Sequence, residues 1–337
     1  MGTTNATQSG RNKSKRPLAN SGQDRTDGYT AVTQQIVSLL RQGVVPWQRP
    51  WSDTGREAPM NVNGRLYRGV NFFLLDMLDF ERPVFLTFRQ ALELGGHVRR
   101  GEKGIPVIFW KMAEAIEEED GEVKTNRVPF MRRYFVFNVS QCEGLTLPAR
   151  LARQPEPPGF DPIQAAETVW ACYPDSPVLR HFGDRAYYSP TTDVITMPPR
   201  HAFNTGENYY ASLFHEMGHS TGHPRRLDRN LGLKHGPQAY SREELTAELC
   251  AAFLCHRAGI SGAVIENQAS YIAYWQRALL DDHKLFVVAA GRAQRAADLI
   301  LGVAENETVS AGGLCGGAGR ESSPGCTHGG EANAMCA

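Results

Sequence analysis

The stretch Tyr210-Ala-Ser-Leu-Phe-His-Glu-Met-Gly-His219 decides the expected fold of the second half of the chain. It contains the pattern H-E-x-x-H, in which two histidines, His215 and His219, lie four residues apart. On an α-helix this spacing places both imidazoles on one face, where one tetrahedral Zn²⁺ can accept a nitrogen from each. Glu216 points to another side of the helix, so its carboxylate can serve as general base for an attacking water molecule.

Apolar residues beside this motif favour a built metal site over a chance match. They recur at helical spacing and form a stripe next to the histidines: Tyr210, Leu213, Phe214 and Met217. The alternative is a pair of hydrogen-bonded core histidines near a capping glutamate. The complete five-residue pattern on an amphipathic helix disfavours that alternative.

A catalytic zinc site needs a third protein ligand and an open position for water. The extended metzincin pattern is excluded, because Arg225 stands where that pattern requires its third histidine. We expect Glu244 to bind the metal and Glu248, one helical turn later, to hold a ligand histidine, with the reverse assignment as the alternative. A capping box between Ser241 and Glu244 would favour that reverse assignment. Two histidines remain as further candidate ligands: His223 and His235.

The distribution of charge separates the two halves of the chain. The 337 residues are enough for two ordinary domains, and the formal net charge is zero. Residues 1–150 carry 21 Lys and Arg against 16 Asp and Glu, whereas residues 151–337 carry 15 against 20. A basic front half joined to an acidic metal-binding half predicts an anionic partner for the front half alone.

Cysteine usage and hydropathy favour a cytoplasmic protein. Seven cysteines occur without a C-x-x-C pair, which is typical of a reduced chain. No apolar run approaches the length of a transmembrane helix, and the first residues lack the core of a signal peptide, so no membrane partner is expected. Two tails rich in small or polar residues are expected to be disordered: residues 1–27 and 304–337.

Residues 28–148 are expected to form an α+β domain. The expected elements are a helix at 29–41 ended by Gly43, a turn at Asn63-Gly64, a helix at 72–78, a strand leading into a helix at 85–95, and a long hairpin with strands at 105–110 and 134–138 joined by an acidic loop.

Basic turns beside aromatic residues in this domain indicate a protein that binds single-stranded nucleic acid. In such proteins aromatic rings stack on bases while Arg and Lys follow the phosphates. The candidate DNA-binding residues are Trp47, Arg65, Tyr67, Arg68, Phe88, Arg99, Arg100 and Lys103. Two alternatives stay open at this point. Basic turns can simply be a solvated face, and a tryptophan on a proline-rich segment such as 44–51 can be a core residue.

Four prolines between Pro148 and Phe160 predict a semi-rigid linker, assigned to residues 149–160. The second domain is expected at residues 161–303. It should contain a helix at 161–170, a hairpin at 186–197, the H-E-x-x-H helix, the helix of Glu244, and closing helices at 270–280 and 285–301. In a metallopeptidase the strand edge beside the metal helix would pair with an extended peptide.

The chain as a whole resembles the ArdC-type antirestriction proteins of conjugative plasmids over residues 28–303. In the front half the resemblance rests on Val45-Pro-Trp47, Pro50-Trp51, Tyr67-Arg68-Gly69-Val-Asn71, Thr87-Phe88-Arg-Gln90, Gly101-Glu-Lys-Gly104 and Phe137-Asn138-Val-Ser-Gln141. In the back half it rests on Tyr188-Ser-Pro190, His215–His219, Thr221-Gly222 and Glu243-Glu244-Leu245-x-Ala247-Glu248.

This resemblance implies a single-stranded-DNA-binding domain followed by a zincin-like metallopeptidase domain, in a protein that protects incoming DNA from host restriction. Zn²⁺ is the expected cofactor, with Mn²⁺ or Co²⁺ as alternatives, and Tyr240 or Tyr271 could stabilise the oxyanion of a cleaved peptide. Two other functions remain open. The chain could be a protease that cleaves one regulatory or restriction-related protein, or a DNA-binding protein whose metal is only structural.

Overall fold

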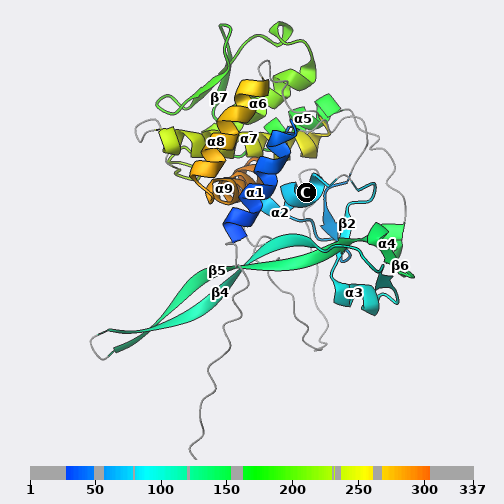
Figure 1. Cartoon of the computed structure of the whole chain (residues 1–337). Helices are drawn as coiled ribbons and strands as arrows, with labels where there is room; N and C mark the ends of the chain where they lie inside the picture. The colour runs from blue at the N-terminus through cyan, green and yellow to red at the C-terminus, as the bar shows by residue number, and fades with distance from the viewer. Residues whose placement is uncertain are drawn as a thin grey trace, which may run out of the picture.

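The computed structural model of the chain describes residues 28–48, 57–78, 80–119, 122–152, 162–229, 231, 237–260 and 268–303. They form the predicted α+β architecture with two domains, a helical half and a half built on a long β-hairpin (Figure 1). Both predicted tails, residues 153–160 of the predicted linker, and His235 lie outside the described residues.

The front half begins with α1 (Gly28–Arg41), and Gly43 follows it with a positive φ of 78°, as expected for a helix end. A four-stranded sheet follows in the order β1 (Met60–Asn61), β2 (Val84–Leu86), β5 (Glu122–Asn138) and β4 (Ile105–Glu119). The remaining elements are α2 (Val70–Asp76), α3 (Phe88–Glu93), the paired strands β3 (His97–Val98) and β6 (Cys142–Glu143), a 3-10 turn (Val139–Gln141) and α4 (Ala149–Ala152).

The β4–β5 hairpin is much longer than predicted. Its strands pair from Ile105 opposite Val136 to Glu119 opposite Glu122, so the acidic stretch is part of β4 and not a loop. The backbone register of the two strands therefore continues where the sequence favours a loop because of its run of acidic residues.

The back half places a small sheet beside a group of helices. The sheet has the order β7 (Val178–His181), β9 (Val194–Met197), β8 (Tyr187–Ser189); β8 and β9 form the predicted hairpin, and β7 adds an unpredicted parallel strand. The helical elements are α5 (Pro162–Ala171), a 3-10 turn (Arg200–Ala202), α6 (Gly206–Ser220), α7 (Pro237–Ala258), α8 (Gln268–Asp281) and α9 (Leu285–Ile300).

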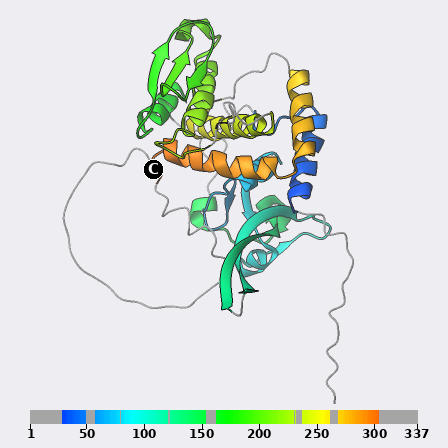
Figure 2. The same cartoon turned by 90° about the vertical axis from the view of Figure 1, so that its left-hand side faces the viewer.

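The largest hydrophobic cluster of the described residues spans both halves, and two smaller clusters belong to the front half alone. Phe73 of α2 packs its ring 4.9 Å from that of Phe253 on α7 and 5.9 Å from that of Phe286 on α9. Residues of α1 and α2 belong to the same buried cluster as the helices of the back half, and α1 lies alongside α8 (Figure 2). The front helices therefore complete the packing of the metal-binding half.

Two further features concern the environment of the chain. No helix among the described residues combines the length and hydropathy needed to span a membrane. Cys142, Cys250 and Cys255 are free, but Cys172 is disulfide-bonded, so the prediction of a fully reduced chain is wrong at this residue. Disulfide formation depends on the distance between two Cα atoms in the fold, which cysteine spacing does not give.

Candidate metal centre and nucleic-acid groove

Three side chains from two packed helices converge on one point. His215 and His219 extend from α6, and their Nε2 atoms are 3.2 Å apart. Glu244 reaches them from α7, with carboxylate oxygens 3.6 Å from Nε2 of His215 and 3.4 Å from Nε2 of His219. Among the residues that the structure describes, these three form the group able to hold a metal ion.

The spacing of these donor atoms fits a tetrahedral metal ion. Two ligand atoms that each lie 2.0–2.1 Å from one tetrahedral centre are about 3.3 Å from each other. The two imidazole nitrogens are 3.2 Å apart, and they lie 3.6 and 3.4 Å from the two different oxygens of Glu244, so the three residues surround one point. Two imidazoles and one carboxylate are also a donor set that Zn²⁺ accepts, with one position left open.

A glycine lets the two helices approach closely enough to form this group. A Cβ atom on Gly218 of α6 would lie 3.0 Å from the Cα of Ala247 on α7, which is closer than ordinary contact. Gly218 and Ala247 are adjacent in sequence to His219 and near Glu244, respectively. The small residue at this position of the H-E-x-x-H segment therefore sets the separation of the ligand-bearing helices.

The electrostatics of the site favour a positive charge at its centre. Burial alone would lower the pKa of His219, but hydrogen bonds with Glu243 and Glu244 raise it to about 10. Burial alone would raise the pKa of the Glu244 carboxyl, whereas its hydrogen bonds with the two histidines hold that pKa well below its usual value. A metal cation can replace the proton that these carboxylates stabilise.

Glu243 contacts the imidazole of His219 on the side away from the candidate metal position. Its Oε1 lies 3.5 Å from Nδ1 of His219, and Arg229 donates to the same carboxylate through Nη2 at 2.7 Å and Nε at 3.2 Å. The side chain of Glu243 is only 3% exposed, so this ion pair is enclosed. Glu243, the residue directly before Glu244, therefore holds His219 from outside, a contact that the sequence analysis did not predict.

The capping alternative for Glu244 does not occur. Helix α7 begins at Pro237, so Ser241 lies inside the helix, and its Oγ is 2.6 Å from the hydroxyl of Tyr274. Of the further candidate ligands, His223 accepts a hydrogen bond from the backbone N–H of Arg225 at 3.2 Å and lies outside the metal group.

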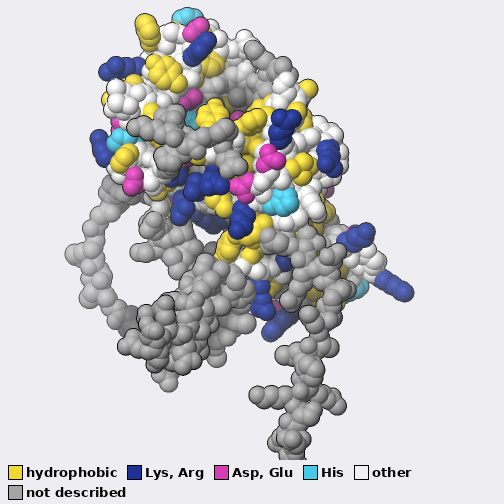
Figure 3. All heavy atoms as spheres, turned by 60° about the vertical axis from the view of Figure 1, so that its left-hand side comes forward, with side chains coloured by type: hydrophobic (Ala, Val, Ile, Leu, Met, Phe, Trp, Pro, Cys, Tyr) yellow, Lys and Arg dark blue, Asp and Glu magenta, His cyan; other side chains and the backbone are white. Residues whose placement is uncertain are grey.

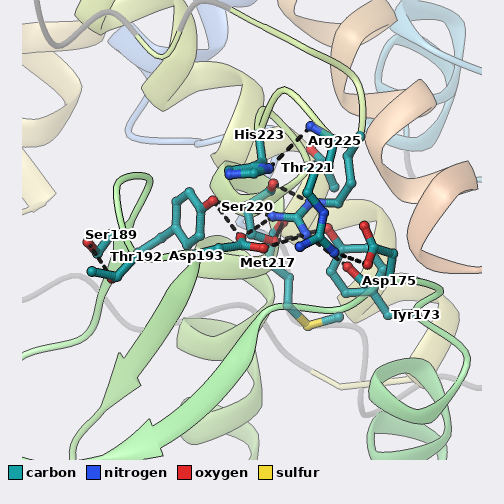
Figure 4. Close-up of polar contacts among 12 residues, drawn as sticks. Tyr173, Asp175, Ser189, Thr192, Asp193, Met217, Ser220, Thr221, His223 and Arg225 are labelled. Atoms are coloured by element: carbon teal, nitrogen blue, oxygen red, sulfur yellow. Dashed lines mark hydrogen bonds and ion pairs between the residues drawn. The ribbon is translucent and has the colours of Figure 1, made fainter.

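An ion pair and hydrogen bonds connect the loop after α6 to the β8–β9 hairpin (Figure 4). Arg226 forms an ion pair with Asp193 and donates through Nε to the carbonyl of Ser220 at 2.8 Å. Tyr188 donates to Asp193 from the other side at 2.8 Å. These contacts hold β8 next to the end of the ligand-bearing helix.

Two cavities meet at the metal ligands. The first, here called the metal cleft, has a volume of about 310 Å³. Its wall contains the three residues of the metal group and Glu216. The other lining residues are Ala186, Tyr187, Tyr188, Pro190, Leu231 and Tyr240. The second, here called the Glu248 cavity, has a volume of about 250 Å³ and shares Ala186, His215 and Glu216 with the first. Glu216 is 8% exposed and lies where the two cavities join.

The two tyrosines considered for the oxyanion lie in different places. Tyr240 is half exposed and lines the metal cleft, where burial and then the neighbouring Glu244 raise its pKa. Tyr271 instead accepts hydrogen bonds from Nε1 of Trp47 at 2.8 Å and Nε2 of Gln48 at 3.2 Å. Only Tyr240 is therefore placed within the metal cleft.

Three of the predicted DNA-binding residues come together in a groove of the front half. A cavity of about 220 Å³ is lined by Arg65, Tyr67 and Arg68, together with Phe109, Tyr134, Gln90 and other residues. The ring of Phe109 meets that of Tyr134 edge to face, with 5.6 Å between ring centroids. Arg68 also forms an ion pair with Asp298 of α9, which ties the groove to the back half.

The other predicted DNA-binding residues divide into exposed and buried ones. Phe88 is 54% exposed, and Arg99, Arg100 and Lys103 are exposed on the turn before β4. Trp47 is only 2% exposed, so the structure places it in the core and leaves no face for a base to stack on. Lys and Arg side chains gather across the middle of the face in Figure 3, while Asp and Glu are scattered there.

Sequence reasoning missed several functional residues for different reasons. Glu243 could have been found, because it precedes Glu244 and its side chain points about 100° around the helix from it. Arg229 carries no pattern that links it to the motif. Phe109 and Tyr134 were assigned to strands, and their common groove depends on the β4–β5 pairing.

Two histidines of one helix and a glutamate of a second, around a site for one metal, define a zincin-like metallopeptidase domain. Residues 172–292 match the family described as zincin-like metallopeptidase, and residues 26–137 match the N-terminal domain of anti-restriction factor ArdC. The chain belongs to the ArdC antirestriction family, which confirms the resemblance found in the sequence.

Solved structures of this family align over most of the chain. The metal-free crystal structure of the antirestriction ArdC protein from the R388 plasmid has a TM-score of 0.66 and 35% identity, covering 83% of this chain and 98% of that one. The Mn(II)-bound structure of the same protein has a TM-score of 0.65 and 35% identity, covering 82% and 98%.

Curated relatives match a similar share of this chain, but they differ from one another in their own length. The uncharacterized protein y4eC of Sinorhizobium fredii is 36% identical over 288 residues, covering 82% of this chain and 92% of that protein. A DNA primase TraC of Escherichia coli is 35% identical over 292 residues, but the match covers only 27% of the primase. The chain thus corresponds to about a quarter of that primase.

Proposed function

We propose that this chain binds single-stranded DNA through its front half, hydrolyses peptide bonds in the metal cleft, and in this way protects incoming conjugative DNA from host restriction. The observation that carries the proposal is the group of His215, His219 and Glu244 beside a buried Glu216, at the meeting point of two cavities. Family membership supports the antirestriction role.

In the proposed mechanism His215, His219 and Glu244 hold a divalent cation, Zn²⁺ or the Mn²⁺ found in the related ArdC structure. When bound, the cation would supply Lewis-acid polarisation of the peptide carbonyl and acidify the attacking water. Glu216 removes the proton from that water and passes it to the leaving amine. Tyr240, at the cleft wall, donates a hydrogen bond to the carbonyl oxygen as it gains charge.

The edge of the small sheet would align the substrate. In the described part of the sheet β8 is an outer strand, and its residues Tyr187 and Tyr188 line the metal cleft. An extended peptide can add to such an edge through main-chain hydrogen bonds, which are independent of its sequence. Because Arg226 and Asp193 fix the hairpin, the peptide would meet the ligands in one register.

We expect the Glu216→Gln protein to keep one equivalent of metal and the wild-type fold, while losing about 100- to 10,000-fold in peptide hydrolysis. The reason is that Glu216 lines the cleft without belonging to the metal group. Elemental analysis after dialysis gives the metal content, and mass spectrometry of a mixed peptide pool gives the hydrolysis. A metal-free Glu216→Gln protein would make this residue structural and leave the mechanism without a base.

The same protein separates the proposal from its main alternative. If Glu216→Gln fails to protect incoming DNA from restriction in cells, hydrolysis is part of the function. If protection survives, the chain acts by covering single-stranded DNA, and the metal site has a structural role in this process.

The groove of the front half is the proposed base-binding surface. Tyr67, Phe109 and Tyr134 offer aromatic surface for bases, and Arg65 and Arg68 at the same cavity offer positive charge for phosphates. The exposed basic turn at Arg99, Arg100 and Lys103 would extend the phosphate path. Stacking on any base is similar in strength, so binding should depend little on sequence.

We expect the Arg99→Ala/Arg100→Ala protein to bind single-stranded DNA of every sequence more weakly by a similar factor. The slope of log affinity against log salt should fall by about 1.4, because two phosphates would no longer be neutralised. Fluorescence anisotropy of the full chain with single-stranded and duplex oligonucleotides measures this, with Arg185→Ala, an exposed arginine of the back half, as control. Equal affinity of the wild type for duplex and single strand would contradict the proposal.

A further inference from the structure

The Glu248 cavity lies beside the metal ligands and has room for a long side chain. Its volume of about 250 Å³ is roughly eight times the share of one water molecule in the liquid. It shares His215 and Glu216 with the metal cleft, so a group inside it would be next to the bond under attack. The mechanism proposed above gives this cavity no role.

Part of the wall consists of small apolar residues on the two metal-binding helices. They are Ala211 on α6 and Ala251, Ala252 and Cys255 on α7. All four are buried, and none of them extends a long side chain into the space. An unbranched aliphatic chain could lie against this wall and lose its contact with water.

Three polar side chains of the wall already donate a hydrogen bond within the protein. Gln48 donates a hydrogen bond through Nε2 to the hydroxyl of Tyr271 at 3.2 Å, and Trp47 donates through Nε1 to the same hydroxyl at 2.8 Å. Ser212 donates to the carbonyl of Asn208 at 2.9 Å. The amide oxygen of Gln48, the hydroxyl oxygen of Ser212 and the carboxylate of Glu248 are the hydrogen-bond acceptors among these lining side chains.

The carboxylate of Glu248 lies next to the hydroxyl of Tyr271. Since the Tyr271 hydroxyl accepts protons from Trp47 and Gln48, its own proton is available to the Glu248 carboxylate, with which it interacts. Burial, followed by this carboxylate, raises the pKa of Tyr271, so the phenol stays neutral. The described residues that line the cavity include no lysine or arginine that could neutralise Glu248.

We propose that the Glu248 cavity is a specificity subsite that takes a lysine or arginine side chain of the substrate, adjacent to the scissile bond. The aliphatic stem lies along the alanines, and the cationic end meets Glu248 and the acceptors of Gln48 and Ser212. This inference rests on the proposed peptidase function, because it assigns part of the substrate of that cleft. It also gives Trp47 and Gln48 of the front half a place in substrate selection.

The test measures binding, so that it does not depend on turnover. The zinc-loaded full chain is titrated by calorimetry with four short peptide hydroxamates, whose metal-binding group is the same. The residue next to the hydroxamate is lysine, arginine, norleucine or glutamate; norleucine matches the lysine stem without its charge. We expect lysine and arginine to bind at least about tenfold more tightly than norleucine, and glutamate to bind most weakly.

Glu248→Gln supplies the matched variant, because it removes the charge and keeps the shape. It should bind lysine and arginine hydroxamates no better than norleucine, while its norleucine affinity and zinc content stay at wild-type values. Glu93→Gln, which removes an exposed carboxylate in the front half, should leave all four affinities unchanged. Circular dichroism confirms that each variant is folded.

Equal wild-type affinities for lysine and norleucine, or a lysine preference that persists in Glu248→Gln, would overturn the subsite while the metal cleft stands. If none of the four hydroxamates binds the zinc-loaded protein, the peptidase cleft itself is refuted, and the subsite with it. The two failures are therefore distinguishable from one set of titrations.

Discussion

Replacing His219 by alanine is expected to lower the affinity of the protein for its divalent cation by more than about 100-fold. Loss of an outer partner of a metal ligand typically costs 10- to 100-fold, and loss of a ligand should exceed that range. Nε2 of His219 is within 3.4 Å of both other donors, and its Nδ1 is oriented by Glu243. Competition with a chromophoric chelator measures the affinity.

Carboxylate variants in the same assay test the choice of third ligand. Glu244→Ala should lose the metal as His219→Ala does, whereas Glu248→Ala should retain one equivalent. His223→Ala is the matched control, since this histidine lies in the next loop and outside the metal group. A His219→Ala protein that still holds one equivalent after dialysis would remove the basis for the metal centre.

Trp47→Ala is expected to lower the free energy of unfolding by about 3–5 kcal/mol, the usual cost of truncating a buried aromatic residue. The Trp47 ring lies 5.6 Å from that of Phe286 and 6.1 Å from that of Trp275, and its Nε1 donates to Tyr271 at 2.8 Å. The truncation would leave a void among these rings and remove one of the hydrogen bonds of the Tyr271 hydroxyl. Guanidinium unfolding followed by circular dichroism gives the change.

The control is Trp110→Ala, because this tryptophan on β4 is 48% exposed. It should cost well under half as much as Trp47→Ala. If Trp47 were a stacking platform for DNA, its removal would instead weaken DNA binding and leave the unfolding free energy unchanged. That pattern would contradict the placement of Trp47 in the core.

The sequence could bring together the three residues of the candidate metal group because they follow helical spacing within two short segments. His215, Glu216 and His219 are fixed by one helix, so their relation needs no tertiary information. The choice between Glu244 and Glu248 is harder, because both lie on one helix, one turn apart. It depends on how α6 and α7 approach each other at Gly218, which no local pattern contains.

Features that depend on distant contacts could not be predicted in the same way. Trp47 donates to a hydroxyl 224 residues further along the chain, so its burial is decided by the packing of the back half. The β4–β5 arm continues through the acidic stretch, whereas strand prediction relies on hydrophobic alternation. Arg65, Tyr67 and Arg68 were found because they lie in one short segment, while Phe109 and Tyr134 reach the same groove from the hairpin.

The core shared by the two halves means that the boundary in the sequence is not a boundary in folding. A fragment ending in the predicted linker would expose Phe73 and Trp47 to water, and its complement would expose the rings that cover them. A protease nick within residues 149–160 would leave two fragments still associated, whereas either fragment made alone would tend to aggregate. Loss of either half by truncation would therefore destabilise the half that remains.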